Sequence, residues 1–180
     1  MKYKSVFGLL TIVIAGTLAG CSSSTQSPDV TGSIRKSLDQ AGYKDVSVSQ
    51  DRDKGVVTLS GKVATDSDKA QAESIAKSQA AGQVVADEIA VIPPNDASAA
   101  KTVNSDLDKG IEKNLHAALT QKRLQKAVKY DVKNGVVTLK GKVNSPSQRA
   151  EAESVTSSVP NVTQVVNELE VKNQKATSTN

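Results

Sequence analysis

The chain has 180 residues, of which 37% are hydrophobic, 23% charged and 2% aromatic. This composition is typical of one or two small globular domains, and it excludes a protein that crosses a membrane several times. The formal net charge is +4, but Lys2 and Lys4 lie in a predicted leader, so the mature chain carries 21 basic and 19 acidic side chains. A net charge of +2 does not indicate a nucleic-acid-binding protein.

The first twenty residues have the pattern of a secretion signal. A basic start is followed by an apolar run over residues 6–15 and by small residues before Cys21. The run is shorter than the stretch of about 20 residues that spans a bilayer. The stretch Leu18-Ala19-Gly20-Cys21 resembles a bacterial lipobox, which implies cleavage before Cys21 and attachment of diacylglyceryl and acyl chains to it. The alternative is an ordinary signal peptide with an incidental cysteine.

We therefore predict a lipoprotein signal peptide over residues 1–20, and an acylated N-terminus with a polar tether over 21–28. After the tether the chain repeats itself. Residues 55–63 (GVVTLSGKV) return as residues 135–143 (GVVTLKGKV), and residues 55–91 match residues 135–171 at 17 of 37 positions. This agreement indicates two copies of one domain, over residues 29–92 and 101–172.

Each copy is predicted to fold as helix, strand, strand, helix and strand. In the first copy, Ile34 and Leu38 have helical spacing, whereas Val57, Leu59 and Val63 alternate with polar residues as in a strand with one buried face. An alanine-rich helix and a last strand follow. We expect an α+β fold: two tandem αββαβ domains, each with a three-stranded mixed sheet covered on one face by two helices.

Four glycines are predicted to have structural roles. Gly55 and Gly135 follow the turn signals Asp53-Lys54 and Asn134, so each is expected in the turn of a hairpin between the two central strands. Gly61 and Gly141 interrupt the buried face of a strand, which indicates a bulge or a close backbone approach, as where a helix crosses the sheet.

The chain between and after the copies has the composition of connecting segments. Residues 93–100 begin with paired prolines and continue with small residues, so they are predicted to be a linker. Residues 173–180 are predicted to be a disordered tail.

The repeated glycine-centred block, the alanine-rich helix and the final residues 165–171 (VVNELEV) resemble the BON family, named after bacterial osmotic-shock protein Y and nodulation proteins. The resemblance covers residues 29–172. Two such copies behind a lipobox resemble the envelope lipoproteins of this family, including a lipid-binding type associated with division and outer-membrane stress. The resemblance implies the αββαβ fold, a periplasmic location, no enzymatic activity and, for some members, binding of anionic phospholipid through the second copy. Ser22 follows the cysteine in place of the aspartate that resembles an inner-membrane retention signal, which favours the outer membrane.

The two copies differ in charge. Residues 29–92 contain 8 basic and 10 acidic side chains, a net charge of −2, whereas residues 101–172 contain 12 and 8, a net charge of +4. On the first helix of the second copy, a step of 100° places one apolar stripe inward: Val103, Leu107, Ile111, Leu115 and Ala118. The candidate contacts for anionic lipid lie opposite this stripe or just after the helix: Lys109, Lys113, His116, Lys122, Arg123 and Lys126. The alternative is a basic face that is only solvated.

The sequence contains no recognisable catalytic motif. His116 is the only histidine, which excludes a His-rich metal site. We expect no enzyme activity, no metal, no small-molecule substrate, no nucleic-acid partner and no cofactor besides the lipid on Cys21. Two functions remain: a lipid-anchored periplasmic module that binds anionic phospholipid and supports envelope integrity, or a protein-interaction or chaperone-like module that contacts other envelope proteins.

Overall fold

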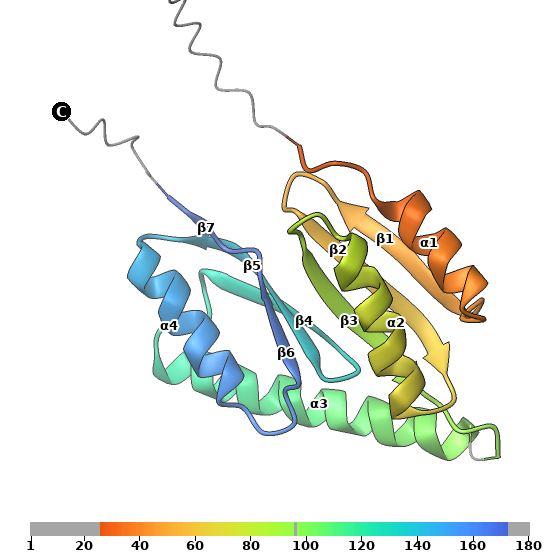
Figure 1. The fold of residues 1–180 in the computed structure, drawn as a ribbon. Helices are drawn as coiled ribbons and strands as arrows, with labels where there is room; N and C mark the ends of the chain where they lie inside the picture. Colours follow the sequence, from red (N-terminus) through yellow and green to blue (C-terminus); the bar gives the residue numbers. More distant parts are fainter. Residues whose placement is uncertain (1–25, 96, 173–180) are drawn as a thin grey trace, which may run out of the picture.

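The structure is a computed structural model that describes residues 26–95 and 97–172 (Figure 1). The first domain contains α1 (Thr31–Gln40), β1 (Val46–Asp51), β2 (Val56–Val63), α2 (Asp66–Gln79) and β3 (Val84–Val91). The second domain contains α3 (Ala97–Gln121), β4 (Val128–Lys133), β5 (Val136–Val143), α4 (Pro146–Ser157), β6 (Gln164–Asn167) and β7 (Glu170–Val171). The predicted fold of two tandem αββαβ domains is confirmed.

Each sheet is mixed, with the second strand of the domain at its centre. β2 pairs antiparallel with β1 and parallel with β3, and β5 pairs in the same way with β4 and β6. The parallel pairs are possible because a helix returns the chain to the start of the sheet between the two strands. The last strand of the second domain differs from the expectation, because it is interrupted after Asn167 and resumes as β7, which also pairs with β5.

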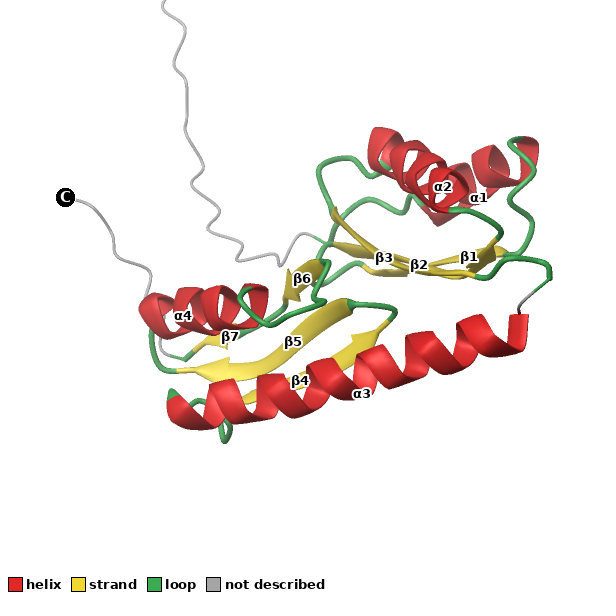
Figure 2. Ribbon diagram, turned by 90° about the horizontal axis from the view of Figure 1, so that it is seen from below, coloured by secondary structure: helices red, strands yellow, loops and turns green. Residues whose placement is uncertain are grey.

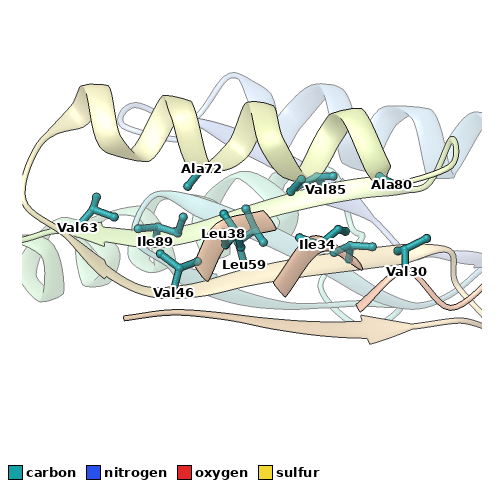
Figure 3. Close-up of a cluster of buried hydrophobic side chains, with 12 residues drawn as sticks. Val30, Ile34, Leu38, Val46, Leu59, Val63, Ala72, Ala80, Val85 and Ile89 are labelled. Atoms are coloured by element: carbon teal, nitrogen blue, oxygen red, sulfur yellow. The ribbon is translucent and has the colours of Figure 1, made fainter. Parts of the chain in front are cut away.

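The two helices of the first domain cover one face of its sheet (Figure 2). Ile34 and Leu38 of α1 are fully buried against Leu59 and Ile89 of the sheet (Figure 3). α2 contributes buried alanines, such as Ala72, so this helix can lie close to the strands. Burial of each large side chain contributes about 1.5–3 kcal/mol, which makes this face the main source of stability.

Gly61 and Gly141 lie where two neighbouring strands begin to pair. Their φ angles are +112° and +125°, and a Cβ on either residue would collide with a backbone carbonyl oxygen, that of Asp45 or of Ala127. These carbonyls come just before β1 and β4. The close approach is therefore made by the adjacent strand, and not by a crossing helix.

Gly55 and Gly135 lie in the turns of the two hairpins and have φ angles of +66° and +81°. In the second domain Asn134 also has a positive φ, +49°, so these two residues alone connect β4 and β5. A two-residue turn of this kind matches the twist of the strands that it joins.

α3 extends well beyond the core of the second domain. Its residues Ile111, Leu115 and Leu119 are buried, whereas Val103 and Leu107 are 55% and 44% exposed. Of the predicted apolar stripe, only Ile111 and Leu115 are buried; Ala118 is half-buried, and Leu119, which was not predicted, fills the core instead. The reason for the exposure of Val103 and Leu107 is visible in Figure 2, where the first half of α3 runs past the second sheet. Because α3 begins at Ala97, the connection between the domains is shorter than the predicted linker over residues 93–100.

The N-terminal end of the described chain is attached to the first domain. The backbone N–H of Ser27 donates to Arg52 at 3.0 Å, and the Gln50 side chain donates to the carbonyl of Pro28 at 2.8 Å. The last residues of the predicted tether are therefore held beside β1. The signal peptide over residues 1–20, the acylation of Cys21, the tether up to residue 25 and the tail over residues 173–180 lie outside the described residues.

Candidate functional site

The basic residues of α3 lie on its solvent-facing side. Lys109, Lys113 and His116 are exposed, and the buried residues Ile111 and Leu115 point the opposite way into the second core. This arrangement follows from the helical period, which separates an apolar stripe from a polar one. The helix therefore presents these three side chains together along one face.

The other basic candidates lie in the connection between α3 and β4. This connection is tight, because Arg123 has a φ of +58° and the N–H of Leu124 donates to the carbonyl of Leu119 at 2.8 Å. Leu124 is buried and anchors the connection, whereas Lys122, Arg123 and Lys126 are exposed. The structure thus places all six candidates on the surface of the second domain.

Two of the six candidates have an acidic partner. Lys109 Nζ lies 3.2 Å from Asp106, and Lys122 Nζ lies 3.3 Å from Glu151 of α4. Such exposed pairs contribute little to stability and can be exchanged for another anion. Lys113, Arg123 and Lys126 form no ion pair within 4.0 Å with any residue in the described part of the chain. These three are the cations of the candidate set that have no ion-pair partner in that part of the chain.

The two domains pack together through the helix-free faces of their sheets. Four side chains form a separate buried cluster there, two from each domain: Val56, Ala86, Val136 and Val166. Ion pairs flank the cluster, with Lys133 Nζ 3.1 Å from Glu88 and Lys54 Nζ 2.5 Å from Glu170. The hydrogen bond from Lys54 lowers the pKa of the Glu170 carboxyl, and the same bond raises the pKa of Lys54. The sequence alone did not predict this contact.

The open edge of β3 is closed by a side chain of the second domain. The amide of Gln164 donates to the Val85 carbonyl at 2.7 Å and accepts from the Asp87 N–H at 3.0 Å. These are the bonds that a neighbouring strand would form. In the first domain the position equivalent to Gln164 is Val84, whose side chain cannot form such bonds.

Beside this edge lies a cleft of about 560 Å³ between the two domains. One wall comes from α2 and β3, and the other comes from the first half of α3, the β4–β5 turn and the connection between α4 and β6. The carboxylate of Asp108 holds the turn by accepting the N–H groups of Asn134 and Gly135 at 2.8 and 2.9 Å. The cleft is therefore a product of the domain contact and belongs to neither domain alone.

Asp87 lies in the wall of this cleft and was not predicted as a site residue. Its side chain is only 6% exposed, and burial raises the pKa of its carboxyl above the ordinary value. The signal in the sequence was a charged residue at an inward position of β3, between Val85 and Ile89, where the second repeat has Asn167.

The folded chain contains no cluster of three or more metal-binding side chains (His, Cys, Asp or Glu) over residues 26–95 and 97–172. None of the helices in that part of the chain is long and apolar enough to cross a membrane. The described residues thus form two tandem αββαβ modules that offer solvent a basic helix face and an interdomain cleft.

The chain belongs to the BON domain family, which matches residues 26–93 and 107–173. BON domains are non-enzymatic modules associated with membrane and phospholipid binding. No curated protein matches the chain.

Two solved structures of CdsD, a structural protein of the type III secretion system of Chlamydia trachomatis, are similar to the chain at low identity. The C-terminal domain of CdsD has 14% identity and a TM-score of 0.33, with 79% of this chain and 65% of that one covered. The second CdsD structure has 13% identity and a TM-score of 0.34, with 80% and 92% covered. The chain thus spans less than two thirds of the length of the first of these structures.

Proposed function

We propose that the protein is anchored by lipid on Cys21 to the periplasmic side of the outer membrane, binds anionic phospholipid through its second domain and supports envelope integrity. The observation that carries the binding proposal is that three exposed cations without an ion-pair partner among the described residues, Lys113, Arg123 and Lys126, lie in the domain whose net charge is +4. Near an anionic membrane surface each basic residue contributes about 1 kcal/mol of attraction.

The position of these cations supports surface binding. They lie on α3 and on the connection to β4, whereas the domain contact uses β5 and β6. Binding to a membrane therefore does not require the two domains to separate. The described part of the second domain has Tyr130 as its only aromatic residue, which favours a shallow electrostatic contact without deep insertion.

The anchor and the location rest on the sequence of residues 1–21. Two or three long acyl chains on one cysteine make anchoring effectively permanent, because each buried methylene contributes about 0.8 kcal/mol. Anchoring also holds the basic surface close to lipid, so weak individual contacts are sufficient for binding.

The test is cosedimentation of residues 22–180 with vesicles that contain increasing fractions of phosphatidylglycerol. We expect binding that rises with the anionic fraction and is lost when salt is raised, because salt screens exposed charges. The double variant Lys113→Glu/Lys126→Glu should bind at least tenfold more weakly. The matched control, Arg35→Glu/Lys36→Glu, makes the same charge change on α1 of the first domain and should bind as the wild type does.

A protein-interaction role is the second candidate, and the exposed apolar residues Val103 and Leu107 of α3 favour it. Equal vesicle binding by both double variants, or none by the wild type at low salt, would remove the lipid proposal and leave this role. In that case Val103→Ser/Leu107→Ser would be expected to abolish association with a partner protein while the fold is retained.

A further inference from the structure

The strongest unexplained feature is the carboxylate of Asp87 in the wall of the interdomain cleft. One of its oxygens accepts the N–H of Ile89 at 3.2 Å, and the other, which forms no hydrogen bond with the described residues, is accessible from the cleft. Asp87 also has no ion pair within 4.0 Å in that part of the chain. Burial of a carboxylate that is 6% exposed and has no ion-pair partner disfavours its charged form.

The second repeat shows that the fold does not need this charge. Asn167 occupies the equivalent position, and its side-chain oxygen accepts the N–H of Leu169 at the same distance, 3.2 Å. Its amide nitrogen donates to Glu153 at 2.8 Å, so the oxygen and the nitrogen of this neutral side chain both form hydrogen bonds. An asparagine can therefore form the same backbone hydrogen bond, and this bond does not explain why the first repeat has an aspartate.

The charged groups around Asp87 leave the cleft negative. Four carboxylates line it, and two ammonium groups oppose them: Asp66, Glu73, Asp87 and Asp108 against Lys69 and Lys77. Lys69 Nζ donates to the Ile89 carbonyl at 2.9 Å, and Lys77 pairs with Glu73 at 2.7 Å. Neither cation forms an ion pair with Asp87 within 4.0 Å, although the charge of each lowers the pKa of that carboxyl, and the net formal charge of the lining is −2.

We propose that the cleft binds a primary alkylammonium group, which pairs with the free oxygen of Asp87. The lining suits such a group, because Leu107 and Val91 offer apolar surface to an aliphatic chain while the carboxylates receive the charged end. The amide side chains of Asn104, Asn134 and Asn161 line the same space and can bond polar atoms of the bound molecule. A metal ion fits less well, because no three metal-binding side chains gather within the described residues.

The raised pKa of Asp87 agrees with this geometry. Burial disfavours the charged carboxylate, and the nearby charge of Glu73 adds to the effect, whereas Lys69, Lys77 and the Ile89 N–H oppose it. A bound ammonium group would supply the missing positive charge and return the carboxyl to its ionised form.

The source of the ammonium group is either a lysine side chain of a partner peptide or a free polyamine. To separate the two, residues 22–180 are titrated with one of two charged probes, and binding is followed by NMR chemical shifts. The probes are Nα-acetyl-lysine N-methylamide, which represents a lysine of a peptide, and 1,5-diaminopentane, which represents a polyamine. The neutral control is the first probe with its side-chain nitrogen acetylated. We expect shifts at Asp87, Leu107 and Asn134 with one or both charged probes and none with the neutral control.

Asp87→Asn should weaken the binding at least tenfold, and it should fold normally because the second repeat carries asparagine at this position. The matched control is Asp39→Asn, which removes the same charge from the exposed side of α1 and should leave the affinity unchanged. Response to the lysine probe alone assigns a peptide ligand, and response to the diamine alone assigns a polyamine. The absence of shifts with both charged probes, equal affinity of Asp87→Asn and wild type, or equal binding of the neutral control would overturn the proposal.

Discussion

The side-chain amide of Gln164 in β6 donates a hydrogen bond of 2.7 Å to the backbone carbonyl of Val85 in β3. The two residues are 79 positions apart and belong to different domains. With its bond to the N–H of Asp87, the same amide takes the place of a strand at the open edge of the first sheet. Because unprotected strand edges favour pairing with other chains, we expect this side chain to make such pairing at β3 less favourable.

Replacement of Gln164 is expected to loosen this edge. In Gln164→Ala, exchange of the Asp87 backbone amide hydrogen should become at least tenfold faster, because two hydrogen bonds of about 1 kcal/mol each are lost. The measurement is hydrogen exchange followed by NMR. Gln79→Ala, which removes a bond between α2 and Ser37 inside the first domain, should leave that amide unchanged. Equal exchange in the two variants would show that Gln164 does not protect the edge.

Gly141 and Gly110 are expected to respond in opposite directions to the same added methyl group. Gly141→Ala places a Cβ against the carbonyl oxygen of Ala127 at a φ of +125°, and the free energy of unfolding should fall by more than about 2 kcal/mol. Gly110 lies in α3 with nothing within 4 Å of the added Cβ, so Gly110→Ala should stabilise by about 0.8–1 kcal/mol. Urea unfolding of both variants measures the difference. A loss of stability in Gly110→Ala equal to that in Gly141→Ala would contradict the argument.

Asp87→Asn is expected to raise the thermal midpoint near neutral pH, and the gain should disappear in acid. Because burial raises the pKa of the folded carboxyl, the folded state prefers protonated Asp87. The stability that comes from this protonation is fully present below the ordinary pKa of 3.8 and is lost as pH rises through the higher pKa of the folded state. Asparagine imitates the protonated form at every pH.

Thermal unfolding of wild type and Asp87→Asn between about pH 3 and about pH 8 measures this effect. The two curves should converge at the acid end and separate as pH rises. A variant that is less stable than wild type at neutral pH would mean that the charged carboxylate stabilises the fold, and that burial is not the dominant influence on it.

Cys21→Ser is expected to block processing, because transfer of diacylglycerol requires a thiol. The variant should remain as a precursor of the full chain length and should incorporate no labelled palmitate. Ser22→Ala, one residue later, should be processed and labelled normally. Electrophoretic size and palmitate labelling measure both variants, and a processed, released Cys21→Ser product would contradict the lipobox interpretation.

The architecture of each domain follows from local patterns in the sequence. Hydrophobic residues repeat with the period of a strand at Val57, Leu59 and Val63, and with the spacing of a helix at Ile34 and Leu38. Each repeat indicates which side of its element is buried. The duplication supports the same elements in both copies, because the two copies share the pattern. The exposed basic face of α3 follows from the same reasoning, since Lys113 lies opposite Ile111 and Leu115 in any helix.

The packing of the two domains against each other is a property of the tertiary structure. The contact of Val56 and Ala86 with the second sheet, and the bond from Gln164 to Val85, depend on the placement of one domain against the other, which no local period records. The exposure of Leu107 also depends on the tertiary structure. The apolar stripe of α3 begins before the part of the helix that packs on the second sheet, so Leu107 has no sheet to cover it. Asp87 could be read in the sequence as a difference from Asn167, but its burial beside α2 and its place in the wall of the interdomain cleft follow from the folded structure.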